Sequence, residues 1–204
     1  MNIGILGTGD VATNLAIGLS NGGHSVKLGS RQPQGKTAPA KNVSVGTQAD
    51  AVKFGEAVIL AVPFSAVKET VDAIGPNAFK GKTLIDATNV FPQPPGWGAS
   101  TSGAEETAKL VPGAKVVKAF NTAFANTMST GKVGSSKLLG LVAADDAAAR
   151  KTVLRLAADL GFDPVDAGPL SSARYMEAMA LMNIRLAFEQ KMGNKIGFAL
   201  ARER

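Results

Sequence analysis

The chain has 204 residues, 45% of them hydrophobic and 19% charged, which indicates a globular protein able to bury a sizeable core. It contains no Cys, which excludes disulfides and thiol nucleophiles and favours a reducing, cytoplasmic location. The formal charge is +6, yet Lys and Arg form no dense cluster with aromatics, so we expect anionic small molecules as partners and no nucleic acid. The first residues do not resemble a signal peptide, and no apolar run is long enough for a membrane span.

The N-terminal stretch carries the most informative pattern. An apolar run at residues 1–6 predicts a buried strand, and a G-x-G-x-x-A turn that contains Gly7 and Gly9 follows it directly. A helical pattern then continues to residue 21, and residues 26–28 predict a second strand. Strand, glycine turn, helix and strand form a dinucleotide-binding unit, in which Gly7 permits the tight turn and Gly9 lets the backbone approach a pyrophosphate. The alternative is an incidental glycine-rich turn. The predicted contacts from this unit are Gly7, Thr8, Gly9, Asp10 and Val11.

The end of the second strand favours NADP(H) over NAD(H). NAD-preferring sites usually place Asp or Glu there, whereas this chain has Ser30 and Arg31, followed by Lys36. A guanidinium can bind a phosphate through two hydrogen bonds, and a serine hydroxyl adds a donor. The alternative is a solvated basic loop.

Strands alternate with helices through the rest of the chain. Further strands are predicted at residues 43–45, 57–62, 83–89, 115–120, 137–143 and 162–165, and helices at 47–54, 65–74, 102–110 and 146–160. This order predicts an α/β fold of the Rossmann type, with a doubly wound, mostly parallel sheet. We expect residues 1–168 to form an NADP-binding domain and residues 169–204 a small C-terminal helical segment. The helix at 171–192 is apolar on nearly every side, with Met176, Met179, Ala180, Ile184, Ala187 and Phe188 on one face. This helix must be covered either by the chain's own sheet or by a second subunit, and we favour a homodimer.

Ligands of open α/β sheets lie beyond the carboxyl ends of the strands. The later strand ends add seven residues to the predicted cofactor site, namely Ala61, Val62, Pro63, Ala87, Asn89, Asn121 and Ala123. The apolar members are expected to line the nicotinamide. Either Asn could bind its carboxamide, or it could serve only in a turn or helix cap.

No catalytic base or metal site is evident. His24, the only histidine, lies at the amino end of the sheet and is expected to be structural, while Tyr175 and Lys118 belong to no recognisable catalytic set. Trp97 could line a substrate pocket, but an aromatic anchor for its proline-rich loop is the preferred interpretation. A deazaflavin or flavin acceptor needs no protein base, because hydride moves between two stacked rings.

The chain resembles the coenzyme F420-dependent NADP oxidoreductase family. The resemblance rests on residues 7–11, 23–26, 29–31, 61–63 and 117–122, together with later matches at 167–170, 173–174 and 192–198. It implies reversible hydride transfer between NADPH and F420 in a Rossmann domain with a small helical tail, and NADP contacts from Thr8 to Val11, Ser30 and Arg31. The third glycine of the family's turn is Ala12 here. The same domain type works with a flavin in six-transmembrane metalloreductases, so FMN and FAD remain candidate second substrates.

Two other functions fit parts of the sequence. A module that senses NADP(H) without turnover would also lack a base. A β-hydroxyacid or imine dehydrogenase shares the N-terminal unit but usually needs a large helical domain, and only about 36 residues (204 minus 168) follow Gly168.

Overall fold

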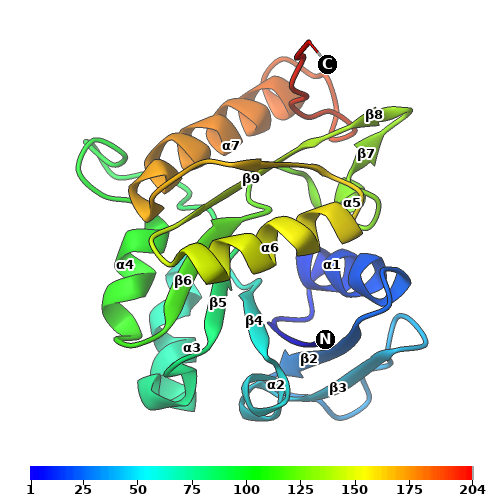
Figure 1. The fold of residues 1–204 in the computed structure, drawn as a ribbon, viewed down its shortest axis with the longest axis vertical. Coiled ribbons are helices and arrows are strands. Elements are labelled where there is room, and N and C mark those ends of the chain that lie inside the picture. The colour runs from blue at the N-terminus through cyan, green and yellow to red at the C-terminus, as the bar shows by residue number, and fades with distance from the viewer. Residues whose placement is uncertain (204) are drawn as a thin grey trace.

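The computed structural model describes residues 1–203 and forms one main sheet (Figure 1). Its eight strands run in the order β10-β9-β6-β5-β4-β1-β2-β3, and each neighbouring pair is parallel except β6 and β9. The strands are β1 (Asn2–Leu6), β2 (Ser25–Ser30), β3 (Val43–Thr47), β4 (Ala57–Leu60), β5 (Thr83–Asp86), β6 (Lys115–Ala119), β9 (Leu139–Ala144) and β10 (Asp163–Asp166). The predicted α/β, Rossmann-type, mostly parallel sheet is confirmed.

Helices cover both faces of this sheet. They are α1 (Asp10–Asn21), α2 (Gln48–Phe54), α3 (Val67–Ile74), α4 (Gly103–Leu110), α5 (Ala125–Met128), α6 (Ala147–Asp159) and α7 (Ala173–Phe188). One apolar core lies between the sheet and α1 and α6, and a second lies between the opposite face and α2, α3 and α4. β4 is buried at all four positions, as expected for a central parallel strand covered on both sides.

Local sequence signals account for several helix starts. Thr47 and Asp50 form a reciprocal capping box at α2, and the Asp146 side chain accepts from the Ala149 amide at α6. The capping box at the start of α4 is incomplete. Ser102 accepts from the Glu105 amide, but the Glu105 carboxylate accepts from the Ser102 hydroxyl and binds Arg174 instead of the Ser102 backbone.

The predicted elements differ from the structure in several places, and the four-residue helix α5 was not predicted. Strands predicted at 57–62 and 83–89 end earlier, which leaves their last residues in the loops beyond the carboxyl edge. A separate hairpin of β7 (Lys132–Val133) and β8 (Ser136–Lys137) was not predicted. α7 is shorter than the predicted 171–192, and its buried face includes the polar side chains of Glu177 and Asn183, while Phe188 is 64% exposed.

α7 lies across the carboxyl edge of the sheet and contacts α4 of the same chain (Figure 1). The division of the chain at residue 168 remains a prediction, and Arg204 lies outside the described residues. Past α7, the chain returns to the sheet, where the Phe198 carbonyl accepts from the Leu139 amide at 2.8 Å.

Phe120 makes an aromatic contact next to the sheet, and His24 makes polar contacts there. Phe120, directly after β6, has a positive φ of 67° and packs its ring against Phe162, with 6.0 Å between ring centroids. His24 contacts Asp159 at 3.1 Å and the N-terminal amine of Met1 at 3.5 Å, far from the carboxyl edge. This placement agrees with the structural role predicted for His24.

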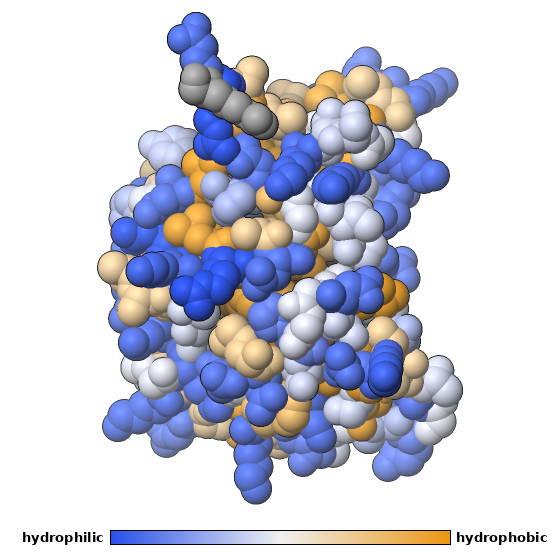
Figure 2. Space-filling model, turned by 45° about the vertical axis from the view of Figure 1, so that its right-hand side comes forward, coloured by the Kyte–Doolittle hydropathy of each residue, from blue (hydrophilic) through white to orange (hydrophobic). Residues whose placement is uncertain are grey.

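One face of the molecule is mostly polar (Figure 2). Figure 2 shows charged and polar side chains over much of one face, with apolar surface gathered in patches between them. Within residues 1–203, no helix has the length and apolar character needed to cross a membrane.

Candidate functional site

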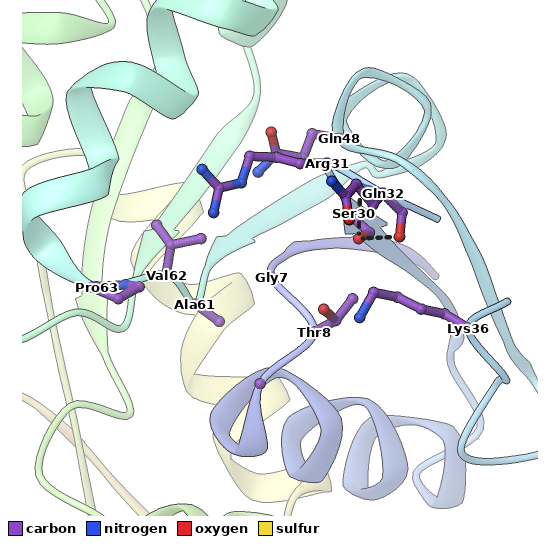
Figure 3. A pocket seen from close by; sticks show the side chains of 12 residues that line it. Gly7, Thr8, Ser30, Arg31, Gln32, Lys36, Gln48, Ala61, Val62 and Pro63 are labelled. Carbon is purple, nitrogen blue, oxygen red and sulfur yellow. Dashed lines mark hydrogen bonds between the residues drawn. The ribbon is translucent and has the colours of Figure 1, made fainter. Parts of the chain in front are cut away.

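A cavity of about 650 Å³ opens at the carboxyl ends of β1, β2 and β4 (Figure 3). It is lined by Gly7, Thr8, Gly9, Gly29, Ser30, Arg31, Gln32, Lys36, Gln48, Ala61, Val62 and Pro63. Nine of these belong to the predicted cofactor site. Gly29, Gln32 and Gln48 were not predicted; the first two adjoin the predicted Ser30 and Arg31, and Gln48 is the first residue of α2.

The glycine turn forms one wall of this first cavity. Gly7 has a φ of 130°, and a Cβ there would lie 2.4 Å from the Ala61 carbonyl oxygen, so only glycine fits. Gly9 caps α1 without a side-chain hydrogen bond, and the position of a Cβ on Gly9 has no protein atom within 4 Å. The open space beside Gly9 and the free amides of the first turn of α1 form a cradle suited to a pyrophosphate.

Two cations, Arg31 and Lys36, also line the first cavity. The Lys36 side chain points toward Thr8, and the Arg31 guanidinium points toward Val62 (Figure 3). Arg31 is paired with Glu69 of α3 at 3.7 Å, and both side chains are more than 70% exposed, so this ion pair is weak. The guanidinium is therefore free to exchange Glu69 for an anionic ligand.

Ser30 has a local role in the structure. Its hydroxyl donates to the Gln32 carbonyl at 3.0 Å and accepts from the Gln32 amide at 3.1 Å (Figure 3). The hydroxyl thus holds the turn that carries Arg31, and it would donate to a phosphate only after the bond to the carbonyl opened.

A second cavity, of about 250 Å³, lies between the start of α1, the segment after β6, and α7. It is lined by Val11, Asn89, Asn121, Thr122, Ala123, Phe124, Ala125, Ala180, Asn183 and Ile184. Four of these were predicted as cofactor contacts, and the three from α7 were not. Asp10 and Ala87 line neither cavity, because Asp10 is exposed at the start of α1 and Ala87 is buried in the core below.

Asn89 and Asn121 bind each other at the edge of the second cavity. The Asn89 side-chain amide donates to the Asn121 carbonyl at 2.8 Å. The Asn121 amide donates to Asn89 Oδ1 at 3.1 Å and to the Met176 carbonyl at 3.0 Å. The Asn121 Oδ1 atom is buried and accepts no hydrogen bond. An unpaired buried acceptor is costly, and a ligand amide would satisfy it after a small local movement.

A buried ionic network lies beneath the second cavity. Lys118 has no exposed surface, and its Nζ lies 2.7 Å from the Thr88 carbonyl, 2.9 Å from Glu177 and 3.3 Å from Asp86. Asp86 also accepts from the Thr88 amide and hydroxyl and from Thr107. Lys118 is thus held by buried partners and lines neither cavity, so it does not reach a bound substrate.

The remaining candidates from the sequence are placed away from the cavities. Trp97 donates to Glu177 at 3.2 Å and packs edge-on against Phe64, which agrees with an anchor for the proline-rich loop. Tyr175 is 74% exposed and lines neither cavity. In the described part of the chain, no group of three His, Cys, Asp or Glu residues could hold a metal ion.

Comparison with known proteins identifies the family. Residues 2–90 match the model of the family described as NADP oxidoreductase, coenzyme F420-dependent. The F420-dependent NADP reductase of Methanothermobacter marburgensis is 31% identical over 95% of this chain and 96% of its own length. The chain belongs to this oxidoreductase family. A protein from Arthrobacter sp. FB24 described as an F420-dependent NADP reductase has a crystal structure with a TM-score of 0.86, at 28% identity, covering 99% of this chain and all of that one.

Other relatives in the comparison are longer proteins. Metalloreductase STEAP3 of Rattus norvegicus is 34% identical over 88% of this chain, and the chain spans only about a third (36%) of that relative's length. An imine reductase from Aspergillus terreus shares the fold, with a TM-score of 0.67 at 20% identity over 63% of its chain. Membership of the F420-dependent family is therefore supported along nearly the full chain, whereas these longer proteins match it only in part of their length.

Proposed function

We propose that this chain binds NADP(H) across the two cavities and exchanges hydride between its nicotinamide and a deazaflavin such as F420. The observation that carries this proposal is the first cavity, which combines a glycine turn at a helix N-terminus with two cations beyond β2. F420 is the preferred acceptor because the full-length relative from Methanothermobacter marburgensis is named for it.

The residues fit the cofactor at both ends. Arg31 and Lys36 would hold the 2′-phosphate, and the α1 amides beside Gly9 would hold the pyrophosphate. At the other end, the unpaired Asn121 Oδ1 is suited to accept from the nicotinamide carboxamide. When bound, NADP(H) would supply the hydride.

The chain's own contribution is binding, orientation and exclusion of water. Apart from Asn89, Asn121 and Asn183, the second cavity is lined largely by apolar side chains, and no charged side chain lines it. Such a wall can hold two flat rings in contact while keeping water from the hydride path. No general base is needed, because hydride transfer between two such rings removes no hydroxyl proton.

Anaerobic spectrophotometry of NADPH oxidation tests the proposal. We expect turnover with F420, slower turnover with FMN, FAD or ferric chelates, and a clear preference for NADPH over NADH. NADPH binding without turnover of any acceptor would support a sensor instead, a function that the absence of a base in the second cavity also allows. Failure to bind either nucleotide would refute both functions.

The oligomeric state is part of the same proposal. The outer side of α7 and the chain just after it expose Tyr175, Met182, Phe188 and Met192, each at least 51% exposed. A second subunit that covered these side chains would make the homodimer expected from the sequence. Analytical ultracentrifugation at micromolar concentration would reveal a stable monomer if this expectation is wrong. The cytoplasmic location expected from the sequence likewise remains a proposal.

A further inference from the structure

Two buried polar side chains of α7, Glu177 and Asn183, bind other parts of the chain. Glu177, 2% exposed, accepts from Trp97 at 3.2 Å and from the Gly103 amide at 3.1 Å through Oε2. Its other oxygen, Oε1, lies 2.9 Å from Lys118 Nζ. One carboxylate therefore joins α7 to β6, to the start of α4 and to the proline-rich loop.

Two further polar contacts hold the same helix. The Asn183 amide donates to the Thr122 carbonyl at 3.0 Å, and the Met176 carbonyl accepts from Asn121 at 3.0 Å. Both partners, Asn121 and Thr122, line the second cavity. The position of α7 and the shape of the second cavity are therefore set by the same contacts.

The apolar face of α7 is poorly suited to fix its register. Three of its four buried apolar residues are Ala173, Ala180 and Ala187, each of which offers a single methyl group, and the fourth is the flexible Met176. A helix rises about 1.5 Å per residue, so small side chains tolerate a shift that would break directional hydrogen bonds. A buried ion pair adds little net stability, but it can select one arrangement among several of similar energy.

We propose that Lys118 and Glu177 are a positioning pair that fixes the register of α7 and thereby the wall of the second cavity made by Ala180, Asn183 and Ile184. The inference rests on the proposed function, because this wall is where the acceptor ring would meet the nicotinamide. The pair contacts neither ring. It acts through α7, and the first cavity on the opposite side of the glycine turn is independent of it.

The test compares Glu177→Gln with the matched control Glu106→Gln, a change to a carboxylate on α4 whose hydrogen-bond partners are Lys109 and Thr101 and not residues of α7. In Glu177→Gln we expect amide hydrogen exchange across residues 173–188 to rise about tenfold or more, while exchange in β1 and β4 stays unchanged. The NADPH Kd should stay within about twofold, and the single-turnover rate of hydride transfer should fall between about tenfold and a hundredfold. The control should match the wild type in all three measurements.

A triple variant separates positioning from stability. Lys118 also pairs with the buried Asp86, so Asp86→Asn and Lys118→Met combined with Glu177→Gln remove all three buried charges, and the Tm should recover part of any loss seen in Glu177→Gln. We expect the transfer rate to stay low in the triple variant, because the directional contact is still missing. A rate that recovers together with the Tm would overturn the proposal.

Amide hydrogen exchange is measured without an acceptor. Failure of the positioning pair can therefore be distinguished from failure of the proposed function. Unchanged exchange in α7 of Glu177→Gln would overturn the positioning pair, whatever the activity. A wild-type protein that binds NADPH but reduces no acceptor would instead overturn the proposed function, while the loosening of α7 would still support a positioning role for the pair.

Discussion

Arg31→Ala isolates the contribution of one exposed guanidinium to the choice between NADPH and NADH. The Arg31 side chain is 75% exposed, lines the first cavity and has a weak partner in Glu69 at 3.7 Å. Two unit charges about 4 Å apart attract by about 1 kcal/mol in bulk water and by about 4 kcal/mol at an effective dielectric constant of 20. Because the cavity is open to solvent, we take about 2 kcal/mol, which corresponds to roughly a thirtyfold loss of NADPH affinity.

NADH lacks the 2′-phosphate, so its affinity should change by less than about threefold. Titration calorimetry with both nucleotides at low salt and at about 0.15 M salt measures the difference, which should shrink as salt rises. Lys68→Ala is the matched control, since Lys68 is an equally exposed cation on α3 that pairs with Asp72 and does not line the cavity. Equal losses for the two nucleotides, or an equal effect of the control, would refute the assignment.

Four other substitutions have distinct expected outcomes. Gly9→Ala should leave the Tm unchanged and weaken NADPH binding about tenfold or more, because the new Cβ would project into the open cradle. A melting curve checks the Tm, and calorimetry on the same sample checks NADPH binding. Gly7→Ala should lower the Tm, since its Cβ would meet a carbonyl oxygen at 2.4 Å, and a wild-type Tm would contradict the strain. Glu69→Gln should tighten NADPH binding by up to about fivefold by releasing the arginine it holds, and an unchanged Kd would argue against that competition. The Arg174 hydrogen bond lowers the pKa of Glu105 from its ordinary value of 4.5, so the pair stabilises the fold above that pH and loses its effect as the pH falls through the folded-state pKa. The Tm difference between wild type and Glu105→Gln should therefore shrink as the pH is lowered below 4.5, and a constant difference would refute this.

Most of the fold could be predicted because its signals are local. The glycine turn directly follows an apolar strand and opens a helix, and the helix starts at Thr47 and Asp146 carry their own capping residues. The first cavity followed from a general rule, since parallel strands place their carboxyl ends at one edge. Residues near the ends of β1, β2 and β4 could therefore be grouped without knowledge of any side-chain contact.

The α7 side of the site could not be predicted, because it depends on contacts between distant parts of the chain. Glu177 and Asn183 interrupt an apolar helix, where a polar side chain is usually solvated, and neither has a partner nearby in the sequence. One signal was present. Asp86 and Lys118 each stand among apolar residues of a predicted buried strand, and opposite charges in two buried strands indicate a buried ion pair.

Phe120 connects the second cavity, which begins at the next residue, with the edge of the sheet formed by β10. A left-handed backbone costs a phenylalanine about 1–3 kcal/mol, and the ring of Phe162, just before the outermost strand β10, helps to offset it. The left-handed backbone at Phe120 sets the direction in which the chain continues into the next residue, Asn121. Under the proposed function, mutations around β10 would alter how Asn121 meets the nicotinamide without touching any ligand, so a search for variants with altered hydride transfer should sample that edge as well as the cleft.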